Sequence, residues 1–149
     1  MKKIIYVDMD GVLVHPSLGL DELSHDTQIK YKGSIFNAPG FFSVLKPMEG
    51  AIDSFKYLSK NFDTYILTAA HWNNPTAASD KIQWVKKYLP NYAHKRIIIS
   101  HNKNLCQGDF IIDDNTRNGV LDFKGEHIHF GSDKFPNWNH VIDYLKNEI

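Results

Sequence analysis

The chain has 149 residues, of which 42% are hydrophobic and 23% are charged, a composition typical of one globular domain. Seventeen basic residues balance seventeen acidic residues, so the formal net charge is zero. Because proteins that bind nucleic-acid polymers usually carry a basic surplus, we expect no such partner. A small phosphorylated metabolite is not excluded, since it needs only a local positive site.

The cysteine content and the N-terminus bear on the cellular compartment. Cys106 is the only cysteine, which excludes an internal disulfide and agrees with a reducing environment. The apolar run Ile4–Val7 after the first two lysines is too short for a secretion signal. No stretch approaches the length of a membrane span. We therefore expect a cytoplasmic protein with no membrane partner.

Short apolar runs that do not alternate with polar residues predict strands buried on both faces of a parallel sheet. Four such runs stand out, and a fifth strand is expected at an edge of the sheet over Ile128–Phe130. The four runs are Ile4–Val7, Tyr65–Leu67, Ile97–Ile99 and Phe110–Ile112.

Helical spacing of apolar residues predicts helices between these runs. One is expected over Met48–Lys60, with Pro47 in its first turn, and another over Ala77–Leu89. A last helix is expected over Val141–Leu145, with Asn139 as its N-cap. Strands that alternate with helices predict βαβ units and an α/β fold with a covered parallel sheet.

The segment from about 14 to 46 breaks this alternation, because it follows the first strand without clear periodicity. Connections of this length are usually functional or form a small subdomain. We expect a single domain over 1–149 in which this segment forms a small cap over the active site.

Polar residues follow the ends of the predicted strands. Since the carboxyl ends of parallel strands meet at one edge of a sheet, these residues should lie close together. They are Asp8, Asp10, Thr68, Lys103, Asp113 and Asp114.

This set of residues predicts phosphoryl transfer. Clustered carboxylates repel one another unless a cation joins them, and Mg²⁺ suits a site that offers oxygen ligands and a phosphate. With Lys103 neutralising charge, Asp8 would attack phosphorus and form an aspartyl-phosphate. Asp10 would protonate the leaving oxygen and then activate water. The hydroxyl of Thr68 and the backbone amide of Ala69 would bind phosphate oxygens.

These residues, in this order, resemble the four motifs of the haloacid dehalogenase (HAD) superfamily. One branch, the 5'(3')-deoxyribonucleotidases, is more similar still, and the similarity covers nearly the whole chain. The segments that carry this second resemblance are Ala38–Phe42, Trp84–Tyr88, Glu126–Ile128, Asn137–Trp138 and the spacing of ten residues from Lys103 to Asp113.

The resemblance implies an HAD-like (Rossmannoid) parallel sheet flanked by helices, with the cap inserted after the first strand. It also implies a Mg²⁺-dependent phosphatase for nucleoside monophosphates, with a preference for deoxyribose. In this family pattern the metal ligands are Asp8, the backbone carbonyl of Asp10, and Asp114, with Asp113 in support. Thr68 and Lys103 bind the phosphate. A homodimer is left open.

Aromatic residues supply the expected substrate pocket. The resemblance places Phe36, Phe41 and Phe42 around the base, where stacking needs no base-specific hydrogen bond. The chain departs from the family pattern after Thr68, where Ala69-Ala70 removes a hydroxyl that could bind phosphate, and we expect His71 and Trp72 to compensate in that loop. The cap is also shorter than in vertebrate relatives.

Two alternative functions stay open, and two metal-binding interpretations are disfavoured. A phosphatase for another small ester, such as a sugar phosphate, would use the same residues, and a non-catalytic phosphate-binding module would keep the same scaffold. A calcium loop at Asp113–Gly119 is disfavoured, because Arg117 falls on a ligand position and Lys124 on that of the terminal glutamate. His127 and His129 share a strand face, as in some metal sites, but no third ligand is evident, and we expect them on the surface of an edge strand.

Overall fold

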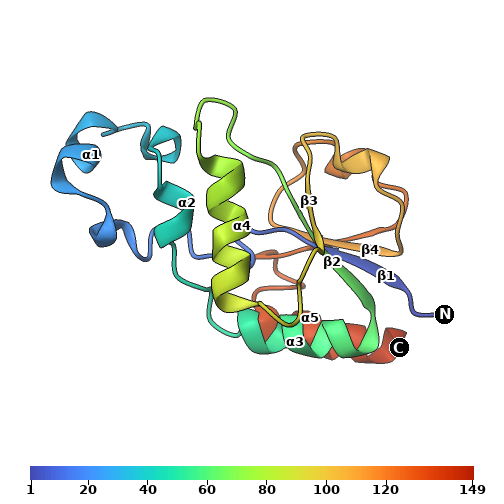
Figure 1. The fold of residues 1–149 in the computed structure, drawn as a ribbon. Coiled ribbons are helices and arrows are strands. Elements are labelled where there is room, and N and C mark those ends of the chain that lie inside the picture. The colour runs from blue at the N-terminus through green and yellow to red at the C-terminus, as the bar shows by residue number, and fades with distance from the viewer.

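The computed structural model describes all residues from 1 to 149 and contains one parallel sheet with the strand order β3-β2-β1-β4-β5. Figure 1 shows this sheet with helices packed against it. All five predicted strands are confirmed, with small shifts at their ends. The strands are β1 (Ile4–Val7), β2 (Asp63–Thr68), β3 (Ile97–Ile99), β4 (Phe110–Asp113) and β5 (Glu126–His129).

Strand β1 lies at the centre of the sheet and pairs with both β2 and β4. Val7 faces Ile66 in β2 and Ile112 in β4, so the chain leaves all three strands at nearly the same level. Asp8 is therefore the first residue beyond the middle of the carboxyl edge. The register alone brings the ends of β2 and β4 beside it.

The longer helices are α3 (Ala51–Asn61), α4 (Ala77–Tyr88) and α5 (Trp138–Leu145). Their buried residues join one core cluster with alternate strand residues, including Ile5, Val7 and Ile66. The other face of the sheet presents Tyr6, Leu67 and Ile111, and short 3₁₀ turns cover it through Val120 and Phe123. No long helix lies on this second face, so the two faces of the sheet are covered differently.

Two predicted helix starts were wrong. Helix α3 begins at Ala51, because Pro47 forms an antiparallel bridge with Val14 and the left-handed Gly50 is the N-cap. The N-cap of α5 is Asn137, whose side chain accepts a hydrogen bond from the backbone N–H of His140 at 3.1 Å. A bridge to a distant segment decided the first boundary and a local side-chain cap decided the second, and the apolar spacing revealed neither.

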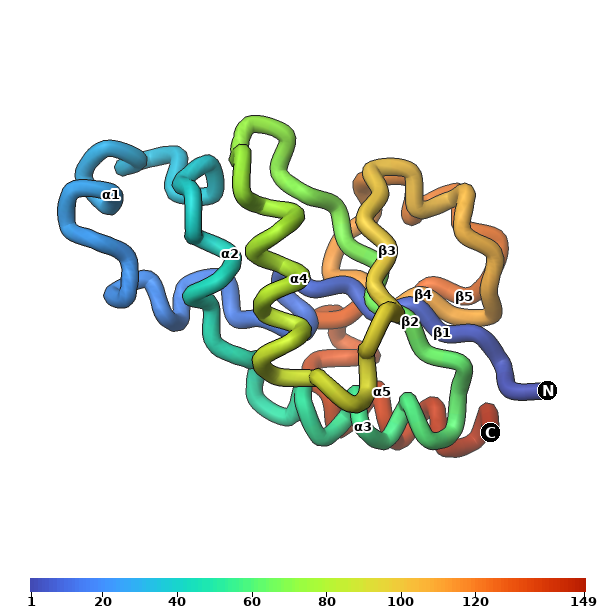
Figure 2. The backbone as a smooth tube through the Cα atoms, in the orientation of Figure 1, coloured from blue at the N-terminus to red at the C-terminus, as the bar shows by residue number.

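The segment between β1 and α3 folds into two 3₁₀ turns and two short helices, α1 (His25–Lys30) and α2 (Phe41–Val44). Figures 1 and 2 show it on the far side of α4 from the sheet. Hydrogen bonds tie it to α4 and to the loop before that helix: Trp84 Nε1 donates to Leu45 O at 2.9 Å, and Asn74 Nδ2 donates to Ala38 O at 2.9 Å. The segment is therefore anchored to the core.

The two ends of the chain lie near each other, as Figure 2 shows, and Lys3 forms an ion pair with Glu148 at 3.0 Å. None of the helices has both the length and the apolar character that a bilayer crossing requires.

Candidate active site

A buried ion group lies at the carboxyl edge of the sheet, where β1 and β4 end. The ammonium of Lys103 lies 3.0 Å from Asp8 Oδ1 and 2.6 Å from Asp113 Oδ2. All three residues are at most 4% exposed. Charges leave water only when they are paired, so this group has a fixed geometry.

Asp114 completes the acidic part of the site. Carboxylate oxygens of Asp8, Asp113 and Asp114 lie within 4.8 Å of one another. Asp114 fits there because Gly11 has no side chain: a Cβ at that position would lie 2.2 Å from Asp114 Oδ2. Gly11 also has a φ of 76°, which favours glycine. We call Asp8, Lys103, Asp113 and Asp114 the acidic floor.

The electrostatics of the acidic floor favour a bound cation. Burial, together with the charge of Asp113, raises the pKa of Asp8 well above its usual range and raises the pKa of Asp114 as well. Burial would lower the pKa of Lys103, but the charges of Asp8 and Asp113 outweigh it and raise that pKa. The site thus holds three carboxylates and one ammonium, which pairs with Asp8 and Asp113. A hard cation with oxygen ligands would relieve the remaining repulsion between the carboxylates.

Backbone groups beside the acidic floor have no partner within the protein. The N–H groups of Asp10 and Ala69 donate no hydrogen bond, and the carbonyl of Asp10 accepts none. Asp10 Oδ1 is also buried without a partner. Unpaired polar atoms beside a buried charge cluster indicate a ligand site. Of the predicted residues, Asp8, Asp10, Thr68, Lys103, Asp113 and Asp114 all meet at this edge.

Lys81, which lies on α4 and is fully buried, was not predicted from the sequence as a site residue. Its ammonium donates to Asp10 Oδ2 at 2.8 Å and to Thr68 Oγ1 at 2.7 Å. One signal was available: Lys81 is four residues from both Ala77 and Val85, and so belongs to the buried stripe of the helix.

Two histidines support the loop after β4. The Nε2 atoms of His127 and His129 lie 3.0 and 3.1 Å from the backbone carbonyls of Asp113 and Asp114, so both nitrogens act as donors. Their rings stack at a centroid distance of 5.1 Å. The shared strand face was therefore predicted correctly. Neither a metal site nor a bare surface describes the pair, because each ring holds one carbonyl of the acidic floor.

Aromatic rings line the side of the site that the segment before α3 provides. His71 stacks between Phe36 and Phe42, with ring centroids 5.2 and 5.0 Å away. Phe36 is 44% exposed and Trp72 88% exposed, whereas the predicted pocket residues Phe42 and Phe41 are buried, at 2% and 0% exposed. Burial lowers the pKa of His71, which favours the neutral ring. We call Phe36, Phe42, His71 and Trp72 the aromatic wall.

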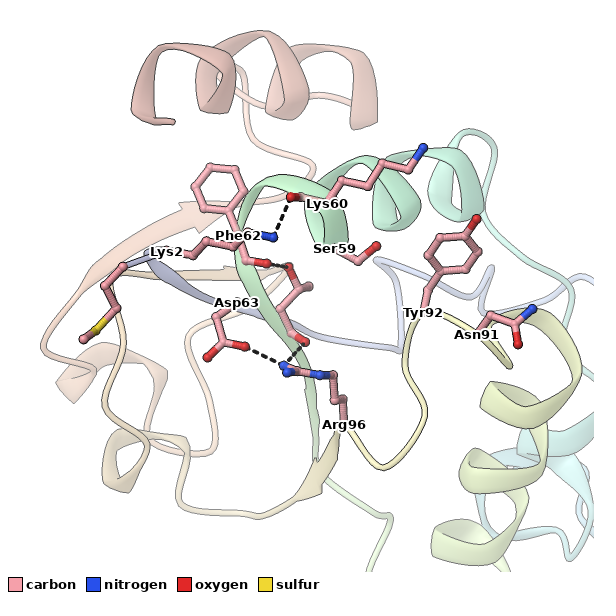
Figure 3. A pocket seen from close by; sticks show the side chains of 10 residues that line it. Lys2, Ser59, Lys60, Phe62, Asp63, Asn91, Tyr92 and Arg96 are labelled. Atoms are coloured by element: carbon pink, nitrogen blue, oxygen red, sulfur yellow. Dashed lines mark hydrogen bonds and ion pairs between the residues drawn. The ribbon is translucent and has the colours of Figure 1, made fainter.

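A hollow of about 560 Å³ lies elsewhere, at the opposite end of β2, as Figure 3 shows. Three of its charged residues already have partners: Arg96 pairs with Asp63 at 2.5 Å, and Lys2 Nζ donates to Lys60 O at 2.6 Å. No unpaired buried polar atom faces it. The buried charges and unpaired polar atoms at the acidic floor therefore make it the candidate reaction site.

Comparison with known proteins agrees with this geometry. The family model described as "5' nucleotidase, deoxy (Pyrimidine), cytosolic type C protein" matches residues 17–147. The chain belongs to this deoxyribonucleotidase family. The match begins after Asp8 and Asp10, and it includes the rest of the acidic floor and all of the aromatic wall.

Named relatives of the deoxyribonucleotidase family are similar over nearly the full length. A protein of Vibrio phage KVP40, provisionally named 5'(3')-deoxyribonucleotidase, is 50% identical over 147 residues, which is 99% of this chain and 86% of that one. The 5'(3')-deoxyribonucleotidase of Bacillus subtilis is 30% identical over 168 aligned positions, covering 99% of this chain and 96% of that one.

Solved structures of HAD hydrolases share the fold. The hydrolase YfnB of Bacillus subtilis, solved with magnesium, superposes with a TM-score of 0.63 at 14% identity, covering 97% of this chain and 98% of that chain. An HAD-like hydrolase of Xanthomonas campestris gives a TM-score of 0.53 at 10% identity, covering 99% and 97%. The predicted HAD-like α/β fold is confirmed.

Proposed function

We propose that this protein is a Mg²⁺-dependent 5'(3')-deoxyribonucleotidase that hydrolyses (deoxy)nucleoside monophosphates through an aspartyl-phosphate on Asp8. One observation carries the proposal: Asp8 lies at the centre of the carboxyl edge, buried and 3.0 Å from the ammonium of Lys103. The printed names of the phage and Bacillus relatives support the substrate class. The cytosolic description of the family and the single cysteine support a cytoplasmic location.

The acidic floor fits the metal that the proposal requires. Asp8, Asp114 and the free carbonyl of Asp10 would hold Mg²⁺, with Asp113 in support. When bound, the ion neutralises charge on the phosphate and on the carboxylates. The magnesium in the YfnB structure and the raised pKa values of Asp8 and Asp114 support this assignment.

The residues then divide the reaction into two steps. In the first, a carboxylate oxygen of Asp8 forms a bond to phosphorus while the ester P–O bond breaks, and Asp10 gives its proton to the departing alcohol. In the second, Asp10 takes a proton from water, the water oxygen attacks phosphorus, and the bond to Asp8 breaks. Inorganic phosphate leaves and Asp8 is free again.

The phosphate oxygens need donors that stay in place through both steps. We assign this role to Lys103, the hydroxyl of Thr68 and the free backbone N–H groups of Ala69 and Asp10. Because these donors are fixed by the strand ends, they stabilise the extra charge of the transition state without rearranging.

We assign the cap role to the segment from about 14 to 46 and base recognition to the aromatic wall. Phe36 and Trp72 are exposed and can stack on a base, while Phe41 supports Phe36 and Phe42 from behind. His71 lies between two rings, in a position where it too can contact the nucleoside.

A panel of phosphate esters tests the proposal. Purified protein with Mg²⁺ is assayed for phosphate release from thymidylate, deoxyuridylate, their ribose counterparts and several sugar phosphates, with Asp8→Asn as the inactive control. We expect the highest kcat/KM for a deoxyribonucleotide. A sugar phosphate as the best substrate would keep the mechanism and overturn the substrate class. Nucleotide binding without turnover would overturn both.

A further inference from the structure

Lys81 is the most deeply buried charge that the proposed reaction does not yet use. Its side chain is fully buried on α4, although a lysine ammonium is normally exposed to water. Three acceptors replace that water: Asp10 Oδ2 at 2.8 Å, Thr68 Oγ1 at 2.7 Å and Ala69 O at 2.9 Å. An ammonium has three N–H donors, so each one is matched.

These hydrogen bonds fix two groups of the proposed reaction. An ammonium only donates, so Thr68 Oγ1 accepts from Lys81 and its own O–H is left free to donate to a phosphate oxygen. Asp10 is held through Oδ2, and its buried Oδ1 is the atom without a partner. The Asp10 side chain as a whole is 32% exposed, so the carboxyl stays open to substrate while Lys81 holds it.

Lys81 has no donor left for the substrate, because all three of its N–H groups are matched within the protein. The side chain is wholly enclosed, and the ring of Phe42 lies 4.7 Å from the ammonium on another side. Helix α4 is itself held, through the hydrogen bond of Trp84 to Leu45 and through packing of Val85 in the core. The position of the ammonium is therefore fixed, and Lys81 can affect the reaction only through the residues to which it donates hydrogen bonds.

We infer that Lys81 is a positioning residue that aims the Asp10 carboxyl at the leaving oxygen. This inference rests on the proposed phosphatase function. It adds one specific consequence: transfer of a proton to the departing alcohol depends on a lysine that never touches the substrate.

Two substrates with different leaving groups test the inference. Lys81→Met keeps the length of the side chain and removes the donors. For thymidylate, whose alkoxide needs a proton, we expect kcat/KM to fall about 100-fold, the scale of general acid catalysis. For p-nitrophenyl phosphate, whose phenolate leaves without a proton, the fall should stay below about tenfold. Equal losses on both substrates would mean a merely structural role and would overturn the inference.

A second pair of variants tests the inference even if Lys81→Met alone does not fold. In an Asp10→Asn background, adding Lys81→Met removes both charges together, which buried pairs tolerate better than the loss of one partner. We expect kcat/KM for thymidylate to change less than about threefold between Asp10→Asn and the double variant, as coupling through Asp10 requires. If Lys81→Met lowered kcat/KM for thymidylate by the same factor in the Asp10→Asn background as in the unsubstituted protein, the inference would be contradicted.

The matched control is Lys86→Met, an exposed lysine on the same helix, which should leave both kcat/KM values unchanged. Circular dichroism and melting curves establish that each variant is folded. If the unsubstituted protein released phosphate from no ester with Mg²⁺, the proposed function would fail, and the inference about Lys81 with it. If the unsubstituted protein is active and Lys81→Met equals it on thymidylate, only the inference fails.

Discussion

The acidic floor and the aromatic wall are built in opposite ways. In the floor, Asp8 follows β1, Asp113 and Asp114 lie at the end of β4, and Lys103 lies in the loop before β4. Asp8, Lys103 and Asp113 are nearly inaccessible to solvent. Wall residues come from the segment before α3 and from the loop after β2, and two of them, Phe36 and Trp72, are largely exposed. Strand register and ion pairing fix the floor, whereas ring stacking and the hydrogen bonds that anchor the segment before α3 order the wall.

This difference indicates that the floor carries the chemistry and the wall carries the selectivity for the base. Ion pairs in a buried site have one geometry, so the floor is suited to a reaction that needs aligned atoms. Rings that stack on one another slide at little cost, so the wall is suited to bases of different size. Helix α4 joins the two regions, because Lys81 binds Asp10 and also lies over the ring of Phe42. The following experiments test how separate the two regions are.

The largest effect is expected at the nucleophile of the floor. Asp8→Asn should lower kcat for thymidylate by more than about 1,000-fold, because an amide cannot attack phosphorus at a useful rate. Binding of the nucleotide should persist, since the wall is unchanged, and equilibrium titration measures it. The control Asp133→Asn, at an exposed acid, should behave as the unsubstituted protein. Retained turnover in Asp8→Asn would contradict the proposed mechanism.

A backbone change beneath the floor should cost less. In Gly11→Ala the new methyl group would lie 2.2 Å from Asp114 Oδ2, so Asp114 must move. We expect Mg²⁺ affinity, measured by calorimetry, to weaken about 10–100-fold, as for changes beside metal ligands elsewhere.

Gly33→Ala is the matched control, because Gly33 has a similar φ of 85° but no atom within 4 Å of its Cβ position. It should carry the same backbone strain and keep the affinity for Mg²⁺. Equal loss in both variants would show that strain, and not the displacement of Asp114, lowers the affinity.

A change in the wall should affect binding more than chemistry. Phe36→Ala removes an exposed ring, and base stacking contributes roughly 1–3 kcal/mol, so KM for thymidylate should rise about tenfold. We expect kcat and the activity on p-nitrophenyl phosphate to stay within about twofold, because the floor is untouched. Ile29→Ala, an exposed residue of α1, is the control. A large fall in kcat would mean that floor and wall are not separable.

The smallest effect is a gain in stability. Burial raises the pKa of Asp8, so the folded metal-free protein binds that proton more tightly than the unfolded chain does. This contribution is complete below the usual carboxyl pKa and is lost as pH rises through the raised pKa of the folded protein.

Asp8→Asn avoids that loss. At pH 7 and without metal it should melt a few degrees higher than the unsubstituted protein, since 1 kcal/mol corresponds to about 2–4 °C for a chain of this size. The gap should close near pH 4 and shrink when Mg²⁺ is added, because the ion stabilises the ionised floor. Identical melting temperatures at every pH would contradict the raised pKa.

The sequence alone predicted the strands and most of the floor, and there are physical reasons why it could. Buried parallel strands read as unbroken apolar runs, and the carboxyl ends of such strands must meet at one edge. Asp8, Thr68, Lys103 and Asp113 could therefore be grouped without coordinates. The aromatic wall was predicted only as a set of aromatic residues, because nothing in the spacing of Phe36, Phe41 and Phe42 indicates which ring is exposed.

Tertiary structure decided what the linear pattern leaves open. The start of α3 depended on a bridge between Pro47 and Val14, which are distant in sequence. Lys81 reads as one more lysine on a helix until packing buries it against Asp10. His129 looks like a surface residue until its ring meets the carbonyl of Asp114. Local patterns encode periodicity and strand ends, whereas the partners of a buried polar atom are chosen by contacts between remote segments.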